Sequence, residues 1–105
     1  MSETSEVTSP LVKAINALPF CRAHRVLSGT APTRGGFIHG ADAGFPDICA
    51  VVRGTPLYLE TKTPEGKLSR TQVKLHDQLR LAGARVSTVR SVSQGIALVR
   101  GLLEQ

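Results

Sequence analysis

The sequence predicts a small α/β domain in which a mixed sheet is flanked by helices, in the order αβββαβα. Two observations predict this class. Several short segments alternate apolar and polar residues, as half-buried strands do, and others repeat apolar residues three and four positions apart, as helices do. Glycine and proline mark the turns between them. The length of 105 residues suits one modest core. We therefore expect a flexible leader over residues 1–8 and a single domain over residues 9–105.

The first helix is expected to begin at Ser9 and Pro10. A serine hydroxyl can cap the first turn, and proline suits the first helical position because its missing N–H would have no partner there. An apolar stripe follows at Leu11, Ile15 and Leu18. Pro19 ends the helix, because proline cannot continue one.

Residues 21–27 are expected to form a strand, and residues 28–44 a long loop. The loop segment, SGTAPTRGGFIHGADAG, contains many glycines and few large apolar side chains. Loops of this length in small domains are usually functional or mobile. Asp42 is a weak candidate metal ligand, because a glycine-rich loop does not fix its position.

The next stretch, GFPDICAVVRGTPLYLETK, predicts a β-hairpin. Its strands are expected over residues 47–52 and 57–62, joined by a turn at RGTP. A second turn, TPEGK, follows. The strands are otherwise apolar, yet both carry charged residues at the end of the hairpin opposite the turn.

Asp47 opens the first of these strands, and Glu60 and Lys62 close the second. Glu60 and Lys62 share one face, because side chains alternate along a strand. If the turn centres on Gly54, Asp47 lies opposite Thr61, give or take a residue. The two carboxylates and the amine are therefore expected to converge at the open end of the hairpin.

Such a cluster suits a divalent metal. Mg²⁺ prefers oxygen ligands and is usually held by one or two carboxylates, together with water and substrate phosphate. Asp47 and Glu60 supply the carboxylates, and the main-chain carbonyl of Thr61 is a third oxygen. Lys62 can then orient water and stabilise the charge of a phosphorane. The alternative is an edge hairpin whose charges form a surface salt bridge, since charges at strand ends are common.

The second half of the chain predicts helix, strand and helix. Ser69 and Gln72 match a capping box, which predicts a helix from Ser69. Its apolar stripe is Leu75, Leu79 and Ala82. Gly83 ends this helix. A strand over residues 85–89 and a helix over residues 91–103 complete the chain. The apolar face of the last helix contains Ile96, Val99 and Leu103.

Histidines and cysteines show no metal-ligand spacing. His24, His39 and His76 are far apart in the sequence. We interpret His39 as a surface residue, and His76, on the polar side of its helix, as solvated. Cys21 and Cys49 lie among apolar residues, so we expect reduced core cysteines of an intracellular protein.

Basic residues outnumber acidic ones by thirteen to eight, for a net charge of +5. This excess suggests an anionic partner, most commonly nucleic acid, although a protein can also be merely basic. We expect the run Lys67, Arg70 and Lys74, together with Arg34, to contact DNA. No segment suits a membrane span, and the polar, acidic start is unlike a signal peptide. The expected location is the cytoplasm of a bacterial or phage-infected cell.

The region from residue 44 to residue 103 resembles the virus-type replication–repair nuclease domain, VRR-NUC, of the PD-(D/E)xK nuclease superfamily. In that family G-x-P-D opens one strand, E-x-K ends the next, and a glycine-containing turn leads to L-S-x-x-Q on a helix. The positions that fit are Gly44, Pro46, Asp47, Glu60, Lys62, Gly66, Leu68, Ser69, Gln72, Leu79, Gly83 and Val86.

The resemblance implies a restriction-endonuclease-like fold and DNA cutting that depends on Mg²⁺ or Mn²⁺, with no small-molecule cofactor. It implies that Asp47, Glu60 and the Thr61 carbonyl bind the metal, that Lys62 is catalytic, and that Gln72 assists beside the metal. It also implies branched DNA, such as four-way junctions, as substrate and a homodimer as the active form.

Several alternatives stay open. The capping box alone accounts for Gln72. Family members often carry a glutamate in the first helix, but Glu6 precedes the expected helix start, so we do not assign it. A non-catalytic, basic DNA-binding module would use the hairpin charges structurally, and a small interaction protein of anti-repressor type is a third possibility. For the homodimer, the candidate surface is the last helix with Ile96, Val99, Leu102 and Leu103.

Overall fold

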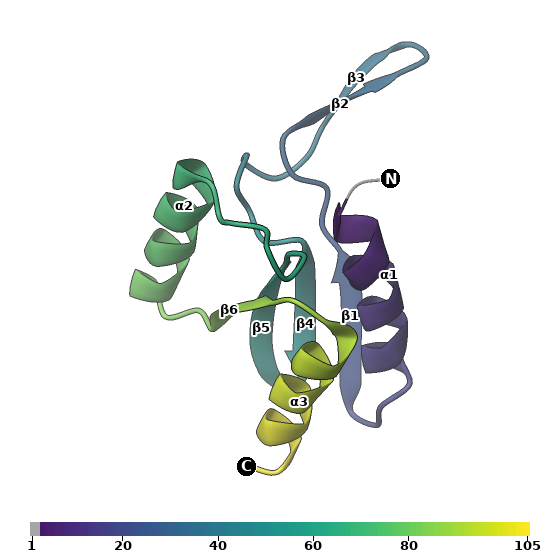
Figure 1. Ribbon diagram of the computed structural model, residues 1–105, viewed down its shortest axis with the longest axis vertical. Helices are drawn as coiled ribbons and strands as arrows, with labels where there is room; N and C mark the ends of the chain where they lie inside the picture. Colours follow the sequence, from purple (N-terminus) through teal and green to yellow (C-terminus); the bar gives the residue numbers. More distant parts are fainter. Residues whose placement is uncertain (1–2) are drawn as a thin grey trace.

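A computed structural model describes residues 3–105 of the chain (Figure 1). The elements are α1 (Glu3–Asn16), β1 (Cys21–Arg25), β2 (Thr30–Thr33), β3 (Gly36–His39), β4 (Ile48–Val52), β5 (Thr55–Thr61), α2 (Arg70–Leu81), β6 (Val86–Val89) and α3 (Val92–Leu103). The predicted order αβββαβα is confirmed, with one addition: β2 and β3 form a separate hairpin between the first two strands of the main sheet.

The main sheet has four strands in the order β1-β4-β5-β6. β1–β4 and β4–β5 pair antiparallel, and β5–β6 pair parallel, so the sheet is mixed as predicted. Arg53 and Gly54 form the turn between β4 and β5, and both have positive φ, as the tightest hairpin turns require. Ile48 pairs with Leu59, which sets Asp47 level with Glu60. This is one residue from the predicted register and within its tolerance.

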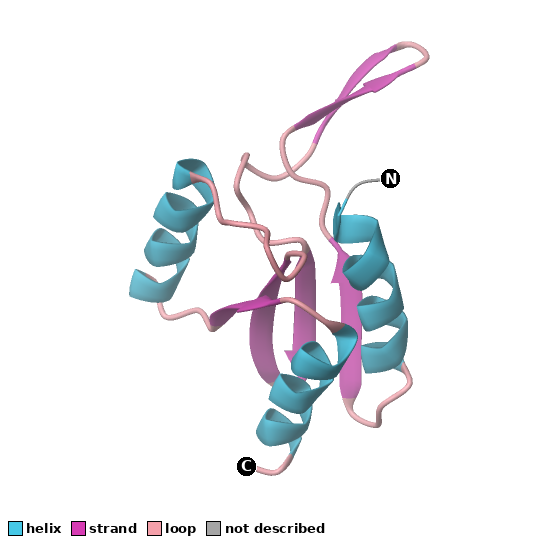
Figure 2. Ribbon diagram, viewed as in Figure 1, coloured by secondary structure: helices cyan, strands magenta, loops and turns pink. Residues whose placement is uncertain are grey.

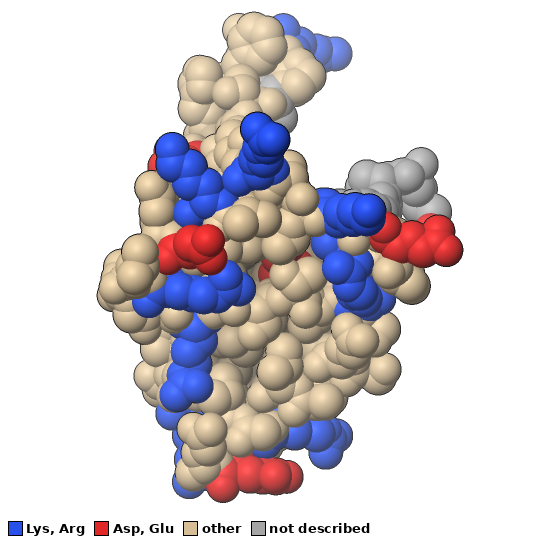
Figure 3. Space-filling view, turned by 60° about the vertical axis from the view of Figure 1, so that its left-hand side comes forward, with Lys and Arg blue, Asp and Glu red and all other residues tan. Residues whose placement is uncertain are grey.

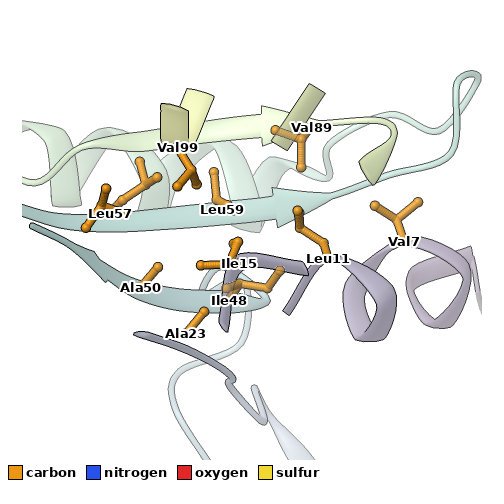
Figure 4. Close-up of a cluster of buried hydrophobic side chains, with 11 residues drawn as sticks. Val7, Leu11, Ile15, Ala23, Ile48, Ala50, Leu57, Leu59, Val89 and Val99 are labelled. Carbon is orange, nitrogen blue, oxygen red and sulfur yellow. The ribbon is translucent and has the colours of Figure 1, made fainter. Parts of the chain in front are cut away.

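The hydrophobic core lies between the sheet and the helices α1 and α3 (Figure 4). It contains Val7, Leu11, Ile15, Ala23, Ile48, Ala50, Val52, Leu57, Leu59, Val89 and Val99. The alternating residues of β5 face the other way, and the buried Glu60 meets His76 of α2 there. The helix α2 therefore packs on the face opposite α1 and α3. None of the helices in residues 3–105 has the length and apolar composition needed to span a bilayer.

The first helix begins earlier than the sequence predicts. It starts at Glu3 rather than Ser9, so residues 3–8 of the expected leader form its first turns, and residues 1–2 lie outside the described part. Pro10 lies inside the helix, where it removes one backbone hydrogen bond and costs about 3 kcal/mol. Burial of Val7 and Thr8 against the sheet offsets this cost, and local sequence signals do not report it.

The segment predicted as a long loop contains a two-stranded ribbon. β2 and β3 pair from Thr30–His39 to Thr33–Gly36, and Arg34 lies in the two-residue turn between them. The ribbon projects from the body of the molecule, at the end of the sheet where β1 ends and β4 begins (Figures 1 and 2). Loop composition misled the prediction, because an exposed ribbon lacks the apolar face by which buried strands are recognised.

Candidate active site

The open end of the β4–β5 hairpin brings the predicted metal ligands together. Asp47 directly precedes β4, Glu60 is the penultimate residue of β5, and Lys62 follows that strand. The pairing of β1 with β4 extends to this point, because the backbone amide of Val26, just after β1, donates to the Asp47 main-chain carbonyl at 2.8 Å. Three neighbouring strands therefore fix the backbone around the two carboxylates.

Asp47 is held by Thr61. Its Oδ2 accepts hydrogen bonds from the Thr61 amide at 3.0 Å and from the Thr61 hydroxyl at 2.9 Å. Since that hydroxyl donates its only proton to Asp47, it must accept from the hydroxyl of Thr8 in α1, which lies 2.5 Å away. Both threonines are fully buried. One oxygen of Asp47 is thus fixed by a buried chain of hydrogen bonds that begins in the first helix.

Glu60 is held by His76. The imidazole Nε2 lies 3.1 Å from Glu60 Oε1, and the side chains are 0% and 1% exposed. When Glu60 is ionised its carboxylate can only accept, and Nε2 must then carry the proton. Burial, and then the nearby positive charge of Arg80, lower the pKa of His76 below its ordinary value, which favours the neutral ring.

The prediction that His76 is solvated is wrong. The apolar residues Leu75 and Leu79 of α2 are only half-buried, whereas His76 is the buried residue of that helix. The inward face follows Gln72, His76 and Leu79, which are spaced i, i+4 and i+7. This spacing was readable in the sequence, but a buried polar partner on the sheet was needed to interpret it.

Gln72 forms the predicted capping box. Its side-chain Oε1 accepts from the Ser69 backbone N–H at 2.8 Å, and its backbone N–H donates to the Ser69 hydroxyl at 3.1 Å. The box is confirmed, while a catalytic role for Gln72 stays a prediction. Gln72 is half-buried and lies one turn before His76, on the same side of α2 as the carboxylates.

The predicted DNA-binding residues are exposed. Lys67, Arg70 and Lys74 lie in and just before the first turns of α2, and Arg34 lies in the turn of the β2–β3 ribbon. Figure 3 shows a recessed acidic surface with lysine and arginine side chains on either side of it. Basic side chains therefore gather around an acidic hollow on this face of the molecule.

A groove of about 360 Å³ lies beside Asp47. Its lining residues are Arg25, Val26, Leu27, Ser28 and Asp47. It runs from the site toward the base of the β2–β3 ribbon, where the Ala41 amide donates to the Leu27 carbonyl. Arg25 and Asp47 thus border the same hollow.

The donor set fits a magnesium-like ion. Within residues 3–105, no group of three or more His, Cys, Asp or Glu side chains is arranged to hold a metal. Two carboxylates and a main-chain carbonyl are an all-oxygen set, which suits Mg²⁺ or Mn²⁺ better than zinc. The hydrogen bonds to Thr61 and His76 fix the carboxylates in the way that ligating carboxylates are usually held.

Gly44, in the loop that leads into Asp47 and β4, packs against the helix α2. Its φ is +88°, and a side chain there would meet the Thr71 carbonyl oxygen at 2.8 Å. Phe45, the next residue, packs edge-on against Tyr58 with ring centroids 5.5 Å apart. The loop before Asp47 is therefore pressed against α2, and only glycine fits at the contact.

Replacing Gly44 with alanine should destabilise the protein more than the same change at Gly54. The two glycines have nearly equal φ, +88° and +87°, but a side chain at Gly54 meets nothing within 4 Å. Strain alone should cost about 1–2 kcal/mol at either position, and the clash at Gly44 should add roughly 1–3 kcal/mol. Urea unfolding of both variants measures the difference. Equal losses would show that the contact with Thr71 is unimportant.

Comparison with solved structures identifies the fold. The chain superposes on a solved structure titled "VRR_NUC domain" with a TM-score of 0.68 and 22% sequence identity, over 95% of this chain and 97% of that chain. The sequence matches no family model and no curated protein. The fold predicted from the resemblance is therefore confirmed: the chain has the fold of a VRR-NUC domain.

Proposed function

We propose that this protein is a metal-dependent DNA endonuclease that acts on branched DNA, such as four-way junctions. The observation that carries the proposal is the pair of carboxylates at the open end of one hairpin: Asp47 is fixed by two hydrogen bonds from Thr61, and Glu60 by a buried hydrogen bond to His76. Lys62 follows Glu60 by two residues. A structural hairpin would have no need to hold two acids so firmly. The VRR-NUC fold supports the same reaction class.

Asp47, Glu60 and the main-chain carbonyl of Thr61 would hold the metal. A divalent ion bound there polarises the scissile phosphate and lowers the pKa of bound water. Hydrolysis adds water across one P–O bond, so the attacking oxygen loses a proton and the departing oxygen gains one. Lys62 would orient the attacking water and stabilise the charge that builds on the phosphate oxygens. Gln72 assists from the adjacent turn of α2.

The DNA backbone would follow the basic residues on the face of the site. Lys67, Arg70 and Lys74 border it on the side of α2. The groove at Arg25 leads from Asp47 toward the β2–β3 ribbon, whose turn carries Arg34. Basic residues on two separate elements, the start of α2 and the β2–β3 ribbon, would suit DNA that bends or branches at the cutting point.

A homodimer would supply two sites with matched polarity, as symmetric cutting of a four-way junction requires. The candidate surface on α3 needs correction, because Ile96, Leu102 and Leu103 pack against the protein's own core and Val99 is fully buried. Leu98 remains exposed and lines a groove of about 420 Å³ between α3 and the β5–β6 edge. This groove replaces the predicted helix face as the proposed dimer contact.

The test is a cleavage assay with purified protein on linear, flap and four-way DNA, in Mg²⁺, Mn²⁺ or EDTA. We expect cutting with either metal and none in EDTA, with four-way DNA cut fastest by paired nicks. Light scattering should return about twice the chain mass of 11.2 kDa. DNA binding that is equal in EDTA and never followed by cutting would instead indicate the non-catalytic binding module.

A further inference from the structure

We propose that His76 is a positioning residue that holds Glu60 in the orientation needed to bind metal. This inference rests on the proposed function, since it assigns Glu60 as a ligand. The Nε2–Oε1 hydrogen bond is 3.1 Å long and has no access to solvent. Hydrogen bonds to metal-binding side chains commonly set ligand orientation, and their loss typically weakens metal binding 10- to 100-fold.

The burial of His76 satisfies one ring nitrogen and, in the part of the chain that the structure describes, leaves the other without a hydrogen bond. Its Nδ1 is buried and, within residues 3–105, has no hydrogen-bond partner of acceptable geometry, although the Gly44 main chain is near the ring. A buried polar atom without a partner is unfavourable, so the contact that accounts for a histidine here is the hydrogen bond from its other nitrogen to Glu60. The chain keeps a histidine at this position, and the group that its other nitrogen contacts is the proposed metal ligand.

The helix that carries His76 is itself fixed. The capping box locks its first turn, and Gly44 packs against Thr71 in that turn. These contacts therefore fix the position of α2 along β5, and with it the position of His76 relative to Glu60. On the other face of the sheet, Thr8 of α1 reaches Asp47 through Thr61. Glu60 is thus oriented directly by a side chain of α2, and Asp47 by Thr61 of β5, which α1 in turn contacts through Thr8.

Three substitutions separate positioning from packing. His76→Gln keeps an N–H donor near the position of Nε2, His76→Leu removes the donor at similar volume, and His76→Asn is polar but too short to reach Glu60. We expect the dissociation constant for Mn²⁺, measured by titration calorimetry without DNA, to rise roughly 10- to 100-fold in the leucine and asparagine variants. It should stay within about threefold of wild type in the glutamine variant, and the Mn²⁺ concentration for half-maximal cleavage should follow the same order.

The outcomes distinguish this inference from the proposed function. Asp77→Asn, at an exposed neighbour of His76, is the matched control and should bind Mn²⁺ as wild type does. If the wild-type protein neither binds Mn²⁺ nor cuts DNA, the proposed function is wrong. If wild type does both and a folded leucine or asparagine variant binds Mn²⁺ equally tightly, the role of His76 is wrong. Thermal melting reports which variants are folded, and the asparagine variant decides if leucine does not fold.

Discussion

Replacing Asp47 with asparagine, or Glu60 with glutamine, should abolish DNA cleavage while the protein stays folded. The amide oxygens can still accept the hydrogen bonds from Thr61 and His76, so the buried contacts survive. The negative charge that a divalent ion requires is removed, however. Alanine at these positions would leave the buried donors of Thr61 and His76 without acceptors, which confuses loss of stability with loss of function.

Replacing Lys62 with methionine should reduce the cleavage rate by roughly 10²- to 10⁴-fold, the range expected when one acid–base or charge-stabilising group is lost. Because the metal ligands are untouched, Mn²⁺ binding should change little. The lysine variant and the carboxylate variants are therefore expected to fail for different reasons. Titration calorimetry with Mn²⁺, together with single-turnover cleavage, separates them.

Matched controls exist for each change. Asp42 and Glu65 are exposed acids, each five residues from its counterpart at Asp47 or Glu60, and Lys13 is an exposed lysine on α1. Asp42→Asn, Glu65→Gln and Lys13→Met should all cut DNA at wild-type rates. Asp42→Asn also tests the weaker candidate ligand of the sequence analysis. Wild-type rates in the variants of Asp47, Glu60 and Lys62 would rule out the proposed metal site.

The parts of the fold that the sequence predicts well are those that depend on interactions between residues close together in the chain. Ser69 and Gln72 encode the start of α2 because both partners of the capping box lie within four residues. The β4–β5 hairpin is readable because apolar alternation and a tight turn occur together, and its register then brings Asp47 to Glu60. These two elements alone predict the site's carboxylates and the helix beside them.

The parts that sequence predicts poorly depend on contacts between distant residues. Thr8 is helical and buried because it meets Thr61, fifty-three positions away, and no local signal outweighs the proline at position 10. His76 is buried because it has a hydrogen-bond partner on the sheet, the carboxylate of Glu60. Both residues help to position the proposed metal ligands. The hydrogen bonds that orient the two carboxylates are therefore the part of the site that is hardest to predict from the sequence.

Deleting the β2–β3 ribbon should weaken DNA binding at least about tenfold without unfolding the protein. Gly29 and Gly40 are joined by a hydrogen bond of 2.9 Å, so an Asn-Gly turn can replace Thr30–His39 between them. The deletion removes Arg34 and the ring of Phe37, which is 68% exposed. A two-stranded ribbon with no layer packed on it is marginally stable by itself, so a bound partner would stabilise it.

Point variants resolve what the ribbon contributes. Arg34→Ala should reduce the slope of log affinity against log salt by about one, as expected when one phosphate contact is lost. Phe37→Ala should weaken binding by roughly 1–3 kcal/mol at any salt concentration if the ring stacks on a base. Fluorescence anisotropy with labelled four-way DNA, in EDTA to prevent cutting, measures both effects.

The same ribbon could instead contact a second copy of the chain, and the deletion distinguishes the two possibilities. If the ribbon binds DNA, the deleted protein keeps the mass of the wild type in light scattering and loses affinity for DNA. A fall to the monomer mass, or unchanged DNA affinity, would contradict a DNA-binding role. The exposed basic turn favours DNA, because Arg34 is the only charged Lys, Arg, Asp or Glu between Thr30 and His39. A ribbon with one positive charge and no negative charge has little to offer an identical ribbon, whereas phosphate neutralises it directly.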